Sequence, residues 1–244
     1  MNAHFMVFSR GMPSKKRSID PLLKIMARLR SPAGCPWDRE QDHDSIKQCL
    51  IEEAYEAVEA IESGDMETLC DELGDLLLQV VFHAQLARER KDFSFFDVVD
   101  RILEKLVRRH PHVFGKIRLS NSDTVLAQWE KIKADERKNA GKQTRSALDH
   151  IPPHLPALMR AEKLHKKAVK AGLVASGEQT KALKQAIRDL TRKKDRKARA
   201  KALGDVLFGF AGLAQKLKLE PEQLLRDANK RFEQWVGKRE RVQR

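Results

Sequence analysis

Residues 48–87 read QCLIEEAYEAVEAIESGDMETLCDELGDLLLQVVFHAQLA, and these forty residues contain ten carboxylates but neither lysine nor arginine. In the whole chain, 48 of 244 residues are lysine or arginine. A gap of this length is therefore expected by chance only about once in several thousand trials. The composition indicates that something keeps cations away from these carboxylates.

Apolar residues recur at helical spacing on both sides of a turn signal at Ser63, Gly64 and Asp65. The first apolar stripe consists of Leu50, Ala54, Ala57, Val58 and Ile61. The second consists of Leu69, Leu73, Leu76, Leu77, Val80, Val81 and Ala84. The pattern predicts two antiparallel helices that are joined by the turn.

The carboxylates on these helices fall into two groups. Glu52, Glu53 and Glu56 lie on the first helix, and Glu72 and Asp75 lie on the second. Residues three or four apart are neighbours on a helix surface, so each like-charged pair costs a few tenths of a kcal/mol unless a cation offsets it. The arrangement suits a divalent metal ion.

Oxygen ligands alone favour magnesium, manganese or calcium, because zinc and the redox metals usually recruit histidine or cysteine. Neither helix contains a Glu-x-x-His sequence, which argues against a di-iron bundle. We therefore predict magnesium, with manganese as the alternative metal. The other interpretation is a solvated acidic face, although such a face normally includes lysine and arginine at helical spacing.

Three more motifs occur in order around this stretch, namely LLKIMARLR at 22–30, GCPWD at 34–38 and RRHPHVF at 108–114. Together with the two acidic groups, they resemble the MazG family of nucleoside triphosphate pyrophosphohydrolases over roughly residues 19–135. The resemblance implies an all-α fold, a dimer, and magnesium-dependent hydrolysis of NTPs or dNTPs to the monophosphate and pyrophosphate. It also implies metal ligands at Glu53, Glu56, Glu72 and Asp75, with Glu52 as an assisting catalytic carboxylate.

Two pairs of residues are candidates for holding the nucleotide. Lys105 and Arg109 are four residues apart, so they share a helix face and can grip phosphate oxygens. Trp129 and Lys133 repeat this spacing and offer a stacking surface beside a charge. Positions resembling these four are associated with nucleotide binding in the MazG family. The alternative for each pair is a surface helix with extended basic side chains and a packed tryptophan.

Two short segments are less informative. Trp37 could line the nucleotide pocket, or the neighbouring Asp38 could cap the region before the acidic helix, and the sequence leaves both open. His110 and His112 have no cysteine or third histidine nearby. We therefore expect them to end the helix at Arg109 and not to bind a metal.

The chain contains an internal repeat. LGDLLL at 73–78 recurs 130 residues later as LGDVLF at 203–208, which indicates a duplication. Ala202 takes the place of Glu72, and KALKQAIRDL at 181–190 replaces the first acidic group, so Asp205 alone remains. A single carboxylate among cations cannot hold magnesium, so we predict that catalysis resides in the first half.

The domain prediction follows from this repeat and from the helix breakers near Asn139 and Gly141. We predict a flexible N-terminal arm at 1–18, a MazG-like catalytic domain at 19–137 and a linker at 138–156. A degenerate, basic MazG-like domain follows at 157–244. The two tandem helical bundles are expected to be completed by dimerisation.

The excess positive charge lies in the second half. Residues 151–244 hold 24 lysine and arginine residues against 10 acids, and the densest run is RKKDRKARAK at 192–201. Such a run can bind nucleic-acid phosphates, steer an anionic substrate or simply be solvated. The alternatives to the hydrolase are therefore a regulatory or nucleic-acid-binding protein that acts through this half, and a scaffold whose second half completes dimer packing.

The three cysteines are odd in number and lack metal-ligand spacing. With no recognisable signal peptide, this predicts reduced thiols and a cytoplasmic location. No apolar run approaches the roughly eighteen residues that a membrane span requires, so no membrane association is expected.

Overall fold

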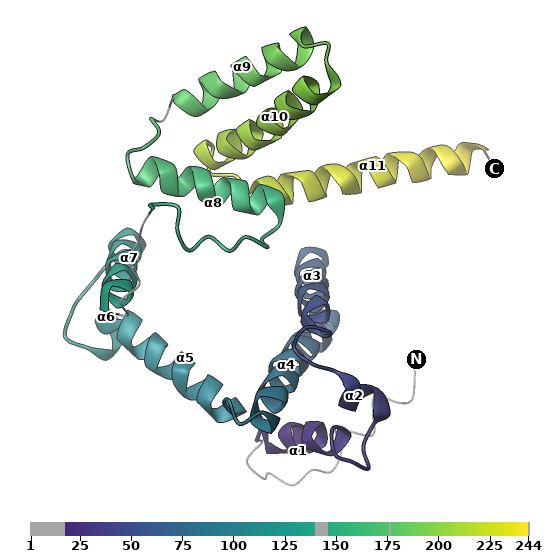
Figure 1. The fold of residues 1–244 in the computed structure, drawn as a ribbon, viewed down its shortest axis with the longest axis vertical. Coiled ribbons are helices and arrows are strands. Elements are labelled where there is room, and N and C mark those ends of the chain that lie inside the picture. Colours follow the sequence, from purple (N-terminus) through teal and green to yellow (C-terminus); the bar gives the residue numbers. More distant parts are fainter. Residues whose placement is uncertain (1–17, 140–145, 176, 244) are drawn as a thin grey trace. The chain divides into compact units, whose positions relative to one another are not determined.

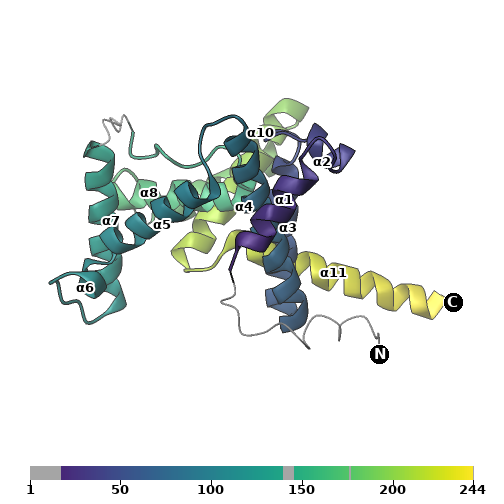
Figure 2. The same cartoon turned by 90° about the horizontal axis from the view of Figure 1, so that it is seen from below.

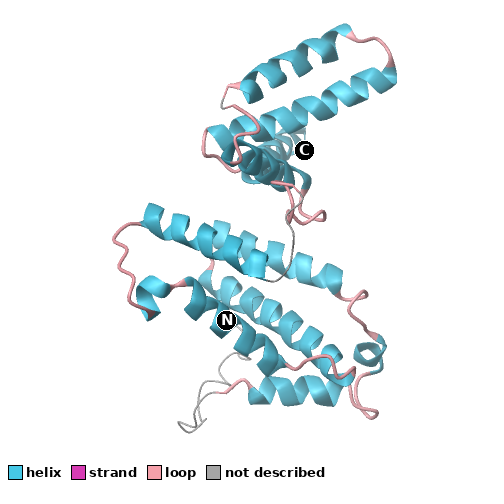
Figure 3. Cartoon of the chain, turned by 60° about the vertical axis from the view of Figure 1, so that its left-hand side comes forward, coloured by secondary structure: helices cyan, strands magenta, loops and turns pink. Residues whose placement is uncertain are grey.

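The computed structural model of the chain describes residues 18–139, 146–175 and 177–243. Within these ranges every regular element is a helix, and Figure 3 shows no strand. The predicted all-α fold is therefore confirmed. The chain divides into two compact units, Met1–Asp135 and Glu136–Arg244. Residues 1–17 of the predicted arm at 1–18 and the centre of the predicted linker lie outside the described residues, and the tandem-domain limits stay a prediction.

The first unit is built from helices that Figure 1 labels in chain order. They are α1 (Asp20–Leu29), α2 (Pro36–Glu40), α3 (Lys47–Ser63), α4 (Met66–Glu89), α5 (Phe95–Arg109), α6 (Pro111–Phe114) and α7 (Ser122–Asn139), the last of which runs past the boundary at Asp135. The predicted acidic helices correspond to α3 and α4, which pack against each other.

The turn between α3 and α4 is set by two residues. Gly64 ends α3 in the left-handed conformation, with φ of 74°, which glycine adopts without a steric penalty. Asp65 caps α4, because its side chain accepts hydrogen bonds from the backbone N–H groups of Glu67 and Thr68. This geometry confirms the predicted antiparallel hairpin.

The apolar core of the first unit lies where α4 meets α1, the residues before α3 and the start of α5. Its buried residues are Met26, Ile46, Val81, Phe82 and Leu86. Figures 1 and 2 show α1 packed against α4. Burial of apolar side chains therefore stabilises the first unit mainly at the C-terminal half of α4.

The two apolar stripes, in contrast, remain partly exposed along the α3–α4 hairpin. On α3 the buried residues are Ala57 and Ala60, which are small. Larger residues of both stripes are between 36% and 59% exposed, namely Leu50, Val58, Ile61, Leu73, Leu77 and Val80. An unpartnered apolar surface of this kind is typical of an interaction site.

Arg30 ties the segment around α2 to α4. Its side chain is only 8% exposed and donates to the Glu89 carboxylate at 2.8–3.1 Å. It also donates to the backbone carbonyl groups of Asp38 and Gln41. The hydrogen bonds from Arg30 are the main cause that lowers the pKa of Glu89.

α5 begins at a capping box formed by Ser94 and Asp97 and ends at Arg109. His110 is its C-cap residue, so the predicted end of this helix is confirmed. The ring of Trp129 on α7 lies edge-on to the His110 ring, with 4.9 Å between centroids. This contact connects α7 to the end of α5.

The second unit contains α8 (Ala157–Lys170), α9 (Glu178–Arg192), α10 (Arg196–Lys216) and α11 (Pro221–Gln243). α9 and α10 form a second hairpin, and α8 packs on α10. Asp195 caps α10 by accepting from the Ala198 N–H group, and it follows Asp65 by 130 residues. The two hairpins therefore have the same register as the repeated sequence.

In the part of the chain that the structure describes, no helix has the length and apolar content to cross a membrane. Cys35, Cys49 and Cys70 are all free thiols.

Candidate metal centre

The α3–α4 hairpin brings three carboxylates together. Glu53 and Glu56 share a face of α3, and Glu72 reaches the same place from α4. One carboxylate oxygen from each residue lies within 4.8 Å of the others. We call these three residues the acidic trio. Glu53 and Glu72 are half-buried, whereas Glu56 is exposed.

Burial and the mutual repulsion of negative charges raise the pKa values of two members of the acidic trio. Burial, then the charges of Asp75, Glu56 and Glu72, raise the pKa of Glu53. Burial is also the first cause that raises the pKa of Glu72, followed by Glu56 and Asp75. Asp75 is exposed and lies outside the trio, although its charge acts on both residues. A cation would relieve all of these repulsions.

The donor set fits a hard divalent cation. Ligand oxygens around a magnesium ion lie near 2.1 Å from the metal, so neighbouring ligands are roughly 3–4 Å apart. The ligand atoms of the trio lie within 4.8 Å of one another, so small side-chain movements would bring them to these separations. Among the described residues, this is the one group of three or more histidine, cysteine or acidic side chains placed to hold an ion. An oxygen-only set favours magnesium or manganese over zinc.

Sequence reasoning missed Gln79, which is buried on α4 with 7% exposure. Its side-chain amide acts on Glu53 across the hairpin and opposes the rise in the pKa of that carboxyl. Its Oε1 has no hydrogen-bond partner among the described residues. The available sequence signal was its position four residues after Asp75, on the same helix face.

The candidate nucleotide-binding residues lie on other helices. Lys105 is exposed on α5, and Arg109 is half-buried at its end. On α7, Trp129 packs against His110, and Lys133 forms an ion pair with Glu130 at 2.7 Å.

Trp37 is 58% exposed on α2, whose N-cap has no side-chain hydrogen bond, and Glu52 is exposed on α3.

These five nucleotide candidates are not brought to the trio within one chain. Among the described residues, Trp37, Lys105 and Trp129 have no hydrogen bond or ion pair to Glu53, Glu56 or Glu72, and Lys133 pairs with Glu130 on its own helix. α5 packs on α4, and α7 has no extended packing with α3 or α4 among the described elements. The acidic and basic halves of the expected site are therefore separate in the single chain.

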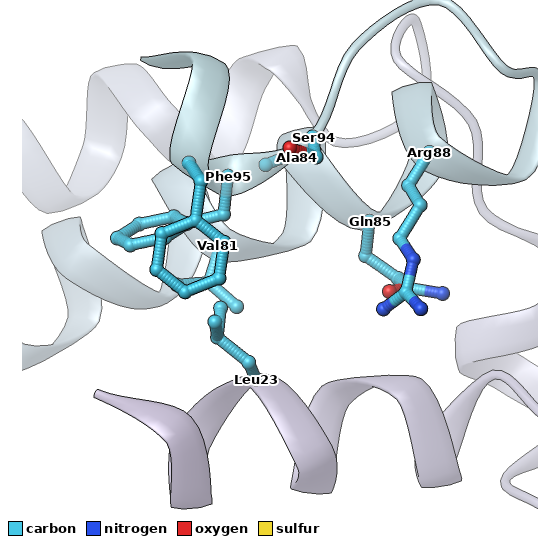
Figure 4. A pocket seen from close by; sticks show the side chains of 8 residues that line it. Leu23, Val81, Ala84, Gln85, Arg88, Ser94 and Phe95 are labelled. Atoms are coloured by element: carbon cyan, nitrogen blue, oxygen red, sulfur yellow. The ribbon is translucent and has the colours of Figure 1, made fainter. Parts of the chain in front are cut away.

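A cavity of about 210 Å³ lies between α1, α4 and the start of α5 (Figure 4). Leu23, Val81 and Phe95 form its apolar side, and Gln85 and Arg88 lie at its polar side. Its α4 residues begin at Val81, beyond Glu72 and Asp75 on that helix. This cavity is therefore distinct from the acidic trio.

The second hairpin has an apolar cluster at the matching register. Leu183, Ala186 and Ala202 follow Glu53, Glu56 and Glu72 by 130 residues, and all three are buried. The remaining acid, Asp205, pairs with Lys201 at 3.0 Å. In residues 177–243 the structure describes no counterpart of the acidic trio.

The all-helical unit and its acidic hairpin match a known class of nucleotide hydrolase. Residues 41–114, which cover α3 to α6, match the MazG nucleotide pyrophosphohydrolase domain. An Escherichia coli relative named nucleoside triphosphate pyrophosphohydrolase is 43% identical over 92% of this chain and 88% of its own length. The chain therefore belongs to the MazG family. Relatives named nucleoside triphosphate pyrophosphohydrolase are, by that name, hydrolases acting on acid anhydrides.

Two further relatives match this chain over different fractions of its length. A Thermotoga maritima protein named nucleoside triphosphate pyrophosphohydrolase/pyrophosphatase MazG is 40% identical over 91% of this chain and 86% of its own length. A Mycobacterium tuberculosis nucleoside triphosphate pyrophosphohydrolase is 44% identical over 62% of this chain and 45% of its own length. The resemblance stated from the sequence motifs is confirmed.

Proposed function

We propose that the chain hydrolyses nucleoside triphosphates, NTPs or dNTPs, to the monophosphate and pyrophosphate in a reaction that depends on magnesium, or manganese in its place. The acidic trio on α3 and α4 is the observation that carries this proposal. The names of the Escherichia coli and Thermotoga maritima relatives support the reaction class. The site would lie in the first unit, because the matching positions of the second hairpin are apolar.

Glu53, Glu56, Glu72 and Asp75 would hold the divalent cation. When bound, the cation would neutralise charge on the triphosphate and on the leaving pyrophosphate. Glu52 is four residues before Glu56 and therefore lies near it on the surface of α3. Its exposed carboxylate would orient the attacking water or accept its proton.

Lys105, Arg109, Trp129, Lys133 and Trp37 are the proposed nucleotide-binding residues. Because a single chain does not bring them to the acidic trio, we propose that a homodimer forms the complete site. The exposed apolar residues of the α3–α4 hairpin continue on α5 and offer a surface for such a dimer; those on α5 are Ile102, Leu103, Leu106 and Val107. A cytoplasmic location, which the free thiols favour, is part of the same proposal.

The test is pyrophosphate release from a panel of NTPs and dNTPs with magnesium, using the unaltered chain and Glu53→Gln. Monophosphate and pyrophosphate should appear in equal amounts, and the variant should release neither. Release from no nucleotide at all would contradict the proposed reaction. Release from the variant at the unaltered rate would contradict the proposed site.

A second candidate function rests on the basic run at 192–201. Its seven lysine and arginine side chains are exposed at the end of α9 and the start of α10. Such a surface can bind nucleic-acid backbones. A gel shift of DNA or RNA at near-physiological salt, lost when Arg196, Lys197 and Arg199 are changed to glutamate, would support this function. No shift under these conditions would exclude it.

A further inference from the structure

Gln79 is a buried polar residue beside the acidic trio that the proposed reaction does not use. It follows Asp75 by four residues and Glu72 by seven, so the three side chains project from one face of α4. From this face Gln79 reaches across the hairpin to Glu53 on α3. It is 7% exposed, whereas Glu53 is only half-buried.

A hydrogen bond between the side chains of Gln79 and Glu53 can have only one direction. An ionised carboxylate only accepts, so the Nε2 of Gln79 must donate to Glu53. The Oε1 of the same amide is buried and has no partner among the described residues. A buried acceptor without a partner costs about 1–3 kcal/mol, so stability alone gives no reason for an amide at this position.

The second hairpin provides an internal comparison. The residues that follow Glu53 and Gln79 by 130 positions are Leu183 and Gly209. A Cβ built on Gly209 would lie 3.1 Å from the Cβ and Cδ1 of Leu183, so the same two positions meet in both hairpins. The second hairpin thus keeps its packing without the acids and also without the amide. The amide therefore accompanies the acidic trio and is not required to form the hairpin.

The choice of an amide also suits a cation site. Lysine or arginine could donate to Glu53 equally well, but a positive charge there would compete with a bound metal ion. An amide supplies the hydrogen bond without the charge. This agrees with the absence of lysine and arginine from residues 48–87.

We propose that Gln79 is a positioning residue for the metal centre, which holds the Glu53 carboxylate in the orientation that lets it join Glu56 and Glu72 in binding a divalent cation. The inference rests on the proposed function of the acidic trio. Residues that orient metal ligands through hydrogen bonds typically change metal affinity about 10–100-fold when they are removed.

The test compares Gln79→Met with Gln85→Met in the full chain. Methionine has nearly the length of glutamine but donates no hydrogen bond. Gln85 lies on the same helix and donates to Glu89 at 2.8 Å, so it is a matched glutamine–glutamate pair outside the trio. Magnesium and manganese affinities are measured by titration calorimetry, and folding is followed by circular dichroism and thermal melting.

We expect Gln79→Met to weaken cation binding about 10–100-fold while the helical content stays unchanged, and Gln85→Met to bind the cation as the unaltered chain does. In activity assays, the concentration of magnesium for half-maximal rate should rise for Gln79→Met, with kcat at saturating magnesium much less affected. In a Glu53→Gln background, Gln79→Met should cause no further loss of cation affinity, because the residue acts through Glu53.

Unchanged cation affinity in folded Gln79→Met, or a loss that simply adds to that of Glu53→Gln, would overturn the proposal. If Gln79→Met does not fold, Gln79→Asn gives the same test, because its shorter amide cannot reach Glu53 in the same way. Failure of the unaltered chain to bind magnesium would instead overturn the metal centre itself, and the role of Gln79 with it.

Discussion

Replacing Glu53 with glutamine should stabilise the metal-free protein while it abolishes turnover. The carboxylate oxygens of Glu53, Glu56 and Glu72 lie within 4.8 Å of one another. In the dielectric of water, two unit charges at such a separation repel by about 1 kcal/mol, so removing the Glu53 charge relieves roughly 2 kcal/mol over two pairs. For a chain of this size, that corresponds to a rise in Tm of roughly 4–8 °C. The glutamine oxygen can still accept the hydrogen bond from Gln79, so this contact is preserved.

The assay is differential scanning calorimetry of the chelator-treated protein at low ionic strength, where charge repulsion is least screened. Magnesium should then raise the Tm of the unaltered chain, because a ligand that binds the folded state stabilises it. The same addition should leave the Tm of Glu53→Gln nearly unchanged. Pyrophosphate release is measured on the same samples.

Glu59→Gln is the matched control, because Glu59 is exposed on α3 and lies outside the acidic trio. Its loss relieves only helix-surface neighbour interactions with Glu56 and Glu62, each worth a few tenths of a kcal/mol, so Tm should change less than for Glu53→Gln and activity should persist. A lower Tm for metal-free Glu53→Gln, or a rise as large for Glu59→Gln, would refute the repulsion argument.

Three other outcomes follow from the structure. The raised pKa values of Glu53 and Glu72 mean that, just above pH 4.5, the folded metal-free protein binds more protons at these residues than the unfolded chain does. The two residues should therefore make the protein less stable as the pH rises through this region. Tm values that rise there with chelator present would contradict the raised pKa values. Arg30→Ala should lower the free energy of unfolding by about 1–2 kcal/mol, since it removes the hydrogen bonds of a buried guanidinium to Glu89 and to two backbone carbonyl groups, and an unchanged free energy in urea denaturation would show that these bonds contribute nothing. Asp205→Asn should release pyrophosphate at the unaltered rate, because Asp205 is exposed and paired with Lys201, and a large loss of rate would place chemistry in the second hairpin.

The sequence was sufficient for the hairpin that forms the candidate site. Gly64 and Asp65 are strong local signals for a helix end and a helix start, and both act as such in the structure. The spacing of Glu53 and Glu56, and of Glu72 and Asp75, predicted which carboxylates share a face of one helix, because helix periodicity alone determines that. The repeat register was equally readable, since Asp195 caps α10 as Asp65 caps α4.

The environment of the apolar stripes was not predictable in the same way. A helix with small residues, acids and large apolar residues on different faces does not reveal which face meets its neighbour. In the structure Ala57 and Ala60 are buried on α3, whereas Val58 and Ile61 stay exposed. The helical spacing of apolar residues therefore predicted the apolar stripe, but it did not predict which residues of α3 become buried.

The nucleotide candidates and Gln79 mark two other limits. The spacing of Lys105 and Arg109 shows that they share a face, but it does not say which other helix that face approaches. Gln79 carries no charge and so does not enter any count of acids and bases. Its position became informative only through the contact between Leu183 and Gly209 in the second hairpin.

The contact between Leu183 and Gly209 also makes the loss of the second acidic site hard to reverse one residue at a time. Gly209→Gln alone would place its side chain against Leu183, where even a Cβ meets two atoms at 3.1 Å. Leu183→Glu alone would bury a charge among Ala186 and Val206 without a partner. Each of these two substitutions is therefore unfavourable unless the other is already present. The packing of the second hairpin thus opposes a return to an acidic site, while its surface charge can change freely.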